Sequence, residues 1–114
     1  MLRWISIGTL LQVAMVATGH STEAVTRLFG PLGMAISLVV GLLWARGGSE
    51  SYPGAARGGG VVGGACALVG IAVSWILGDV SASVLAFGTL ASAAAGALGG
   101  LAGRRVRPAA GSAR

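Results

Sequence analysis

The sequence predicts an all-α membrane protein in which four transmembrane helices form an up-down bundle, packed through Gly, Ser and Ala small-xxx-small faces. Composition supports the membrane class, since 54% of the 114 residues are hydrophobic and only 10% are charged, unlike a soluble globular chain. The 21 Gly residues and an aromatic fraction of 5% support the mode of packing, because small side chains let helices approach closely.

Four apolar runs without a charged residue define the predicted spans. They cover residues 4–19, 28–45, 61–78 and 83–103, within a single domain over residues 1–103. A membrane-spanning helix needs about 20 residues, and lipid offers no partner for a non-helical backbone. The Gly, Ser and Pro rich segment 46–60 is predicted to be a loop, and the basic segment 104–114 a disordered tail.

The arginines lie almost entirely on one side of this topology. Arg3, Arg46, Arg57 and the arginines of the tail share a side, and only Arg27 falls opposite. The positive-inside rule then places both termini and the central loop in the cytoplasm. Abundant Ala, Gly, Val and Arg are typical of GC-rich bacteria, so the expected location is a bacterial inner membrane. The basic residues form no helix face interleaved with aromatics, so nucleic acid is not an expected partner.

The first run has an alternative interpretation as a cleaved signal peptide. Arg3 precedes an apolar core, and the small residues Ala17 and Gly19 come before His20. Three spans would then remain, with the termini on opposite sides of the membrane.

A pattern of small residues recurs in three of the four runs. It reads GMAISLVVG at 33–41, GIAVSWILG at 70–78 and GTLASAAAG at 88–96. Residues four apart lie on one face of a helix, where Gly or Ser leaves room for a neighbouring backbone. The predicted packing residues are therefore Gly33, Gly41, Gly70, Ser74, Gly78, Gly88, Gly96 and Gly100.

The first run places Gln12 where the other runs have Ser. By the predicted span limits, Gln12, Ser37 and Ser92 all lie near the middle of the membrane, where they form a candidate polar layer. One interpretation is a set of hydrogen bonds that joins the helices. The other is a narrow polar pathway, although no ionisable residue lies within any run, as ion-coupled carriers usually require.

Other reactive residues give weaker signals. His20, Glu23 and Asp79 are expected near the outer surface, without the spacing of a metal site. Cys66 stands alone and is interpreted as a small packing residue. We expect no cofactor, no metal and no enzymatic activity.

In length and number of spans the chain resembles the small multidrug resistance transporters, but Gln12 stands where their first helix carries a glutamate. Its size and Arg-rich end are similar to those of some phage holins. Neither likeness rests on a motif, so we assign no family. The expected function is that of an assembly or accessory subunit, which associates with its own copies or with a larger complex in the bilayer. An oligomeric channel or small-solute transporter is the alternative, and a holin-like pore former is the third.

Overall fold

The computed structural model describes residues 1–24 and 28–106, and four long helices account for most of them. These are α1 (Leu2–Ser21), α3 (Phe29–Arg46), α4 (Tyr52–Ile76) and α5 (Ala82–Arg105). Each is long and apolar enough to cross a membrane. The prediction of an all-helical chain with four such helices is confirmed.

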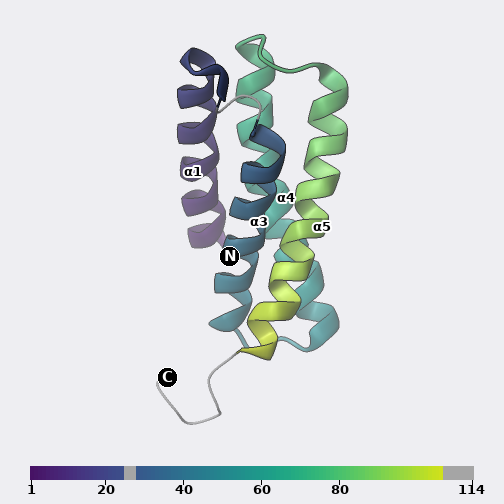
Figure 1. Ribbon diagram of the computed structural model, residues 1–114. Helices are drawn as coiled ribbons and strands as arrows, with labels where there is room; N and C mark the ends of the chain where they lie inside the picture. The colour runs from purple at the N-terminus through teal and green to yellow at the C-terminus, as the bar shows by residue number, and fades with distance from the viewer. Residues whose placement is uncertain (25–27, 107–114) are drawn as a thin grey trace.

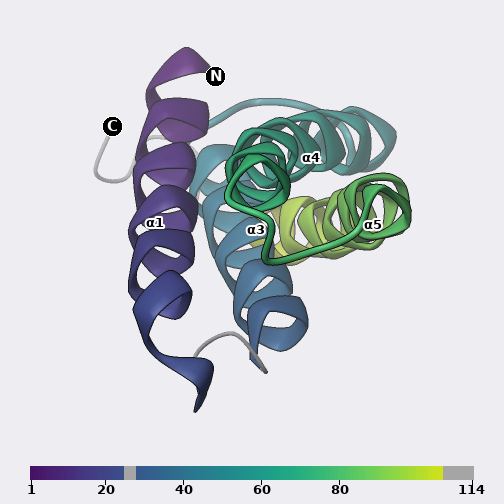
Figure 2. The same ribbon diagram turned by 90° about the horizontal axis from the view of Figure 1, so that it is seen from above.

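The helices lie side by side, with α3 and α4 between α1 and α5. The colours of Figure 1 show that consecutive helices run in opposite directions, and Figure 2 shows α1 and α5 on opposite sides of α3. The pair α4 and α5 has the most extensive contact, followed by α3 and α5. Among the described residues, α1 packs against α3 and α4 but does not reach α5.

The contacts of α5 with its two neighbours are made by backbone rather than by large side chains. A Cβ atom added at Gly99 or Gly103 would collide with carbonyl oxygens of α3, and one added at Gly96 or Gly100 with carbonyl oxygens of α4. Such close approach is the arrangement that maximises van der Waals contact between helices.

The central connection differs from the prediction of a loop over residues 46–60. Helix α4 begins at Tyr52, nine residues before the predicted span. The side chain of Ser51 caps it by accepting a hydrogen bond from the Gly54 amide at 3.3 Å, and Pro53 occupies its first turn. Gly58 and Gly59 then lie in the helix, against Trp44 of α3 and Gly96 of α5. Tertiary contact thus makes a Gly-rich segment helical despite its low helix propensity.

The other helix ends lie closer to the predicted limits of the spans. Helix α1 continues to Ser21, past the predicted end at residue 19, while α4 ends at Ile76. Arg104 and Arg105 belong to α5 and not to a separate tail. Residues 107–114, the rest of the predicted basic tail, lie outside the described residues, as does Arg27.

Candidate functional site

Gln12 of α1 is buried, 1% exposed, and faces α3. Its Nε2 atom donates a hydrogen bond to the Gly33 carbonyl oxygen at 3.1 Å and a longer one to Ser37 Oγ at 3.4 Å. A backbone carbonyl can only accept, so this contact fixes which end of the amide faces α3. The Gln12 side chain therefore joins α1 to α3.

Ser37 and Cys66 extend this contact to α4. Ser37 Oγ donates to the Gly63 carbonyl oxygen at 3.0 Å, and Cys66 Sγ donates to the same oxygen at 3.2 Å. The sulfur also lies 4.0 Å from both Gln12 Nε2 and Ser37 Oγ. We call Gln12, Ser37 and Cys66 the polar junction; it connects three helices through buried groups.

The predicted polar layer is thus formed only in part. The structure brings Gln12 and Ser37 together, but Ser92 of α5 makes no hydrogen bond to either in the described part of the chain. Cys66 takes the third position instead. The sequence carried a signal for it, because Cys66 precedes Gly70 by four residues and so extends the small-residue face of that helix.

The predicted packing residues lie in different environments. A Cβ atom at Gly41 would come within 2.5 Å of the Gly96 carbonyl oxygen, and one at Gly70 within 2.6 Å of Gln12 Cβ. Gly33 faces the Gln12 amide, Gly100 faces Ala55 of α4, and Gly88 faces the flexible end of Ile71.

Gly78 does not have the predicted packing role. It lies beyond the end of α4, and no atom would lie within 4 Å of an added Cβ. Its φ angle is +81°, a conformation that Gly adopts without strain, so Gly78 reverses the chain between α4 and α5. The Gly and Ser pattern at 70–78 therefore extends two residues beyond the end of α4.

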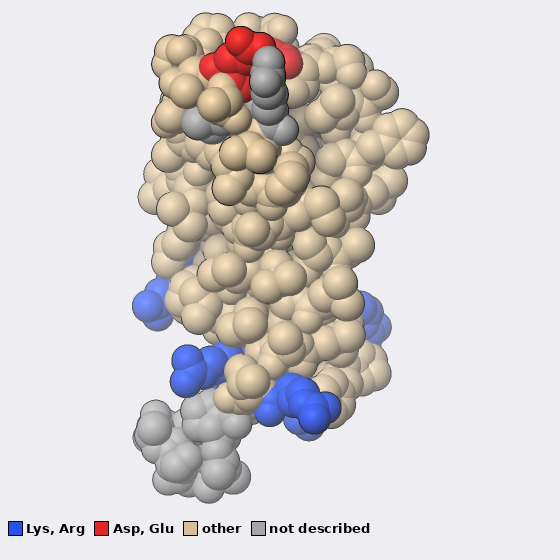
Figure 3. Space-filling view, in the orientation of Figure 1, with Lys and Arg blue, Asp and Glu red and all other residues tan. Residues whose placement is uncertain are grey.

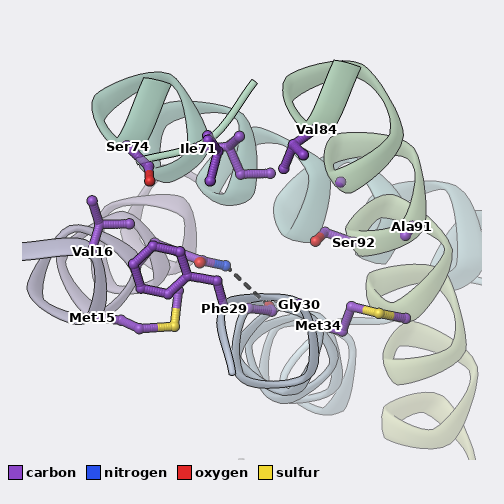
Figure 4. Close-up of a pocket in the computed structure, with 14 residues that line it drawn as sticks. Met15, Val16, Phe29, Gly30, Met34, Ile71, Ser74, Val84, Ala91 and Ser92 are labelled. Carbon is purple, nitrogen blue, oxygen red and sulfur yellow. Dashed lines mark hydrogen bonds between the residues drawn. The ribbon is translucent and has the colours of Figure 1, made fainter. Parts of the chain in front are cut away.

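A cavity of about 90 Å³ adjoins the polar junction on the side toward the α4 to α5 turn. All four helices contribute to its wall, as Figure 4 shows. The apolar part of the wall includes Met15, Phe29, Met34, Ile71 and Val84. Its polar groups are Gln12, Ser74 and Ser92, and none of the lining residues is ionisable.

Ser74 is the unusual member of this wall. It is 1% exposed, and its hydroxyl oxygen has no hydrogen-bond partner in the described structure. In Figure 4 this oxygen points into the cavity. A buried polar group without a partner costs about 1 to 3 kcal/mol, so the arrangement calls for a physical explanation. Sequence reasoning assigned Ser74 to packing and missed this feature.

A side-chain hydrogen bond joins α1 to the α4 to α5 turn at the end of the bundle beyond the cavity. His20 Nδ1 of α1 lies 3.0 Å from Asp79 Oδ2 in the turn between α4 and α5. This contact brings together two of the three residues, His20 and Asp79, that were expected near the same surface. Over residues 1–24 and 28–106, no group of three His, Cys, Asp or Glu residues has the arrangement of a metal site.

Comparison with known proteins adds no further information on the chain. Neither the models of protein families, nor the curated proteins, nor the solved structures gave a match. The class that the fold defines is an all-helical protein with four helices able to cross a membrane.

Replacing Gln12 by Leu tests the polar junction. We expect Gln12→Leu to lower the free energy of unfolding by about 1 kcal/mol, because hydrogen bonds between membrane helices contribute about 0.6 kcal/mol on average and about 1.7 kcal/mol at most. Reversible unfolding in mixed micelles measures the change. Thr18→Val is the control, since the Thr18 hydroxyl bonds to the Ala14 carbonyl oxygen of its own helix, at 2.8 Å, and to no other helix. Equal effects of the two substitutions would contradict a role of Gln12 between helices.

Proposed function

We propose that the chain is a small, non-enzymatic, multi-pass protein of a bacterial inner membrane, which acts as an assembly or accessory subunit through helix packing. The polar junction carries this proposal. Gln12 is the largest fully buried side chain, and its donor group is used to join α1 to α3 instead of facing an open path. An interior held together in this way suits a protein that presents fixed surfaces to others.

The charges support an orientation with both termini in the cytoplasm. Arg46 ends α3, Arg57 lies near the start of α4, and Arg104 and Arg105 end α5, so antiparallel helices bring them to one end. Figure 3 shows basic side chains toward that end and acidic ones at the opposite end. By the positive-inside rule, the basic end faces the cytoplasm.

The small-residue faces support an up-down bundle as the unit that assembles. Most of these faces are occupied within the chain, some by contacts of α5 with α3 and α4 and others, at Gly33 and Gly70, by Gln12 of α1. Fewer small-residue faces are therefore left for association with other chains than the three repeated patterns of the sequence suggest. All four helices keep exposed apolar side chains, and the outer faces of α1 and α5, where Leu10 is 71% exposed and Leu90 67%, are among the surfaces left for association.

Crosslinking in native membranes tests this function. A photoreactive residue at Leu10 or at Leu90 should give discrete crosslinked species, either a dimer of the chain or an adduct with one other membrane protein. The same group at Val62, which is 0% exposed, is the control and should give none. A chain that stays monomeric at every concentration, and crosslinks to no protein from either helix, would overturn the proposal.

The cavity supports a second candidate function, that of a channel or small-solute transporter formed by oligomers. It reaches Gln12 from the side of the α4 to α5 turn and includes Ser92 of the predicted polar layer. Flux of ions and small solutes into proteoliposomes should then exceed that of empty vesicles and fall with Gln12→Leu. Flux equal to that of empty vesicles would exclude this candidate.

A further inference from the structure

We infer that the cavity between the four helices is a binding site for a small, uncharged molecule with an apolar body and one hydroxyl group. The inference rests on the cavity wall and on the partnerless hydroxyl of Ser74, and it does not depend on the proposed role in assembly.

The size and the wall of the cavity define the body of the ligand. A cavity of about 90 Å³ exceeds the room that one water needs, and is smaller than the apolar cavity of about 150 Å³ known to hold benzene. Its surface is formed mostly by Met, Phe, Ile and Val side chains. A molecule of about five non-hydrogen atoms with an aliphatic chain fits these limits.

All three polar residues in the wall have unused hydrogen-bonding capacity, since the Ser92 hydroxyl also makes no hydrogen bond among the described residues. The Ser74 hydroxyl has no partner. Gln12 uses only its Nε2 atom, as a donor, so that its Oε1 atom accepts no hydrogen bond within the described structure. A ligand hydroxyl can both donate and accept, which matches an amide oxygen that only accepts and a serine hydroxyl that does either.

The absence of ionisable groups from the wall defines the charge of the ligand. The fourteen lining residues include no acid and no base. A charged ligand would therefore lose its hydration without gaining a counter-ion, at a cost of several kcal/mol. An uncharged alcohol avoids this cost.

The methionines provide a direct readout. Met15 and Met34 line the cavity, and Met34 is also 39% exposed at the outer surface, whereas Met1, the third methionine, is not among the lining residues. We propose to titrate 1-butanol into the full chain in lipid nanodiscs, with 13C-labelled methionine methyl groups, and n-pentane as a probe of the same length without a hydroxyl. We expect saturable shifts of the Met15 and Met34 signals, a millimolar dissociation constant for butanol, and an unshifted Met1 signal.

Two substitutions test separately the contribution of the Ser74 hydroxyl to binding and that of the space in the cavity. Ser74→Ala should weaken butanol binding about fivefold, the effect of one lost hydrogen bond, and leave pentane binding unchanged. Ser6→Ala, on the exposed face of α1, should change neither. Because Ser74 has no partner to lose, the Ser74→Ala chain should fold, and unshifted methyl signals in the absence of ligand verify this. Ala91→Leu, which fills the cavity from α5, should abolish binding of both probes.

Three outcomes would overturn the inference. Shifts of Met15 and Met34 that rise linearly without saturation would mean that butanol acts through the bilayer. Equal affinity for pentane and butanol would exclude recognition of the hydroxyl, and so would butanol binding that Ser74→Ala leaves unchanged. None of these results bears on crosslinking to partners, so failure of the site and failure of the assembly role are distinguishable.

Discussion

Gly96→Ala should strongly destabilise the bundle, by about 3 kcal/mol, although it adds a single methyl group. The new Cβ would collide with the Gly59 carbonyl oxygen and come within 3.0 Å of Gly63 Cα, both in the backbone of α4. On the opposite side, the carbonyl group of Gly96 itself lies against Gly41 of α3. A backbone has no rotamer that relieves such contact, so α5 would have to move away from both neighbours.

The measurement is the free energy of unfolding in mixed micelles, with two matched glycines as controls. At Gly88, the nearest atom to an added Cβ is the flexible end of Ile71, at 2.8 Å, and at Gly30 nothing lies within 4 Å. We expect Gly88→Ala and Gly30→Ala each to cost less than about 1 kcal/mol; at Gly30 the gain in helix propensity is offset by contact of the new methyl group with the ring of Pro31. A loss at Gly96 no larger than that at Gly88 would contradict the close approach of α5 to α4.

The sequence predicted where the helices lie along the chain better than which neighbouring helix each of their faces contacts. Apolar runs without charge must be helical in lipid, so their number and approximate limits follow from physics alone. Spacing by four residues identified Gly41 and Gly96, which do face one another. It did not identify Gly99 and Gly103, the glycines on the second face of α5, against α3. Which neighbour covers which face depends on how four helices are arranged, and no single helix carries that information.

The candidate site was predictable to a similar extent. Gln12 stood out as the largest polar residue within an apolar run, and a hydrogen bond across helices was the expected consequence. The expected depth in the membrane predicted its partners only in part. Ser37 and Ser92 were both expected at the depth of Gln12, but of these two serines only Ser37 is hydrogen-bonded to it. The cavity beside it could not be predicted, because a cavity is the space that packed side chains fail to fill.

The start of α4 was mispredicted because its composition is that of a loop. The three glycines at 58–60 disfavour an isolated helix, each by about 1 kcal/mol relative to Ala. In the bundle the same glycines are what allows α4 to lie against other helices. Gly58 lies under the indole ring of Trp44, and Gly59 lies against the carbonyl oxygen of Gly96. Residues that weaken a helix on its own thus enable its packing.

A double-substitution experiment at Gly58 and Trp44 distinguishes the packed helix from the predicted loop. A Cβ atom at Gly58 would collide with Cη2 and Cζ3 of the Trp44 ring, which is rigid and also packs against the cluster of Val40, Val62 and Cys66. We expect Gly58→Ala alone to lower the free energy of unfolding by about 2 to 3 kcal/mol, the usual cost of overpacking.

In a Trp44→Leu background the steric conflict is removed, and Gly58→Ala should then have little effect or stabilise α4 through its higher helix propensity. The two substitutions should therefore differ from additivity by about 2 kcal/mol, a coupling expected only for residues in contact. Gly54→Ala, in the first turn of α4 beside Glu50, is the control and should be additive with Trp44→Leu. If residues 52–60 formed a loop, Gly58 and Trp44 would be independent, and both pairs of substitutions would be additive.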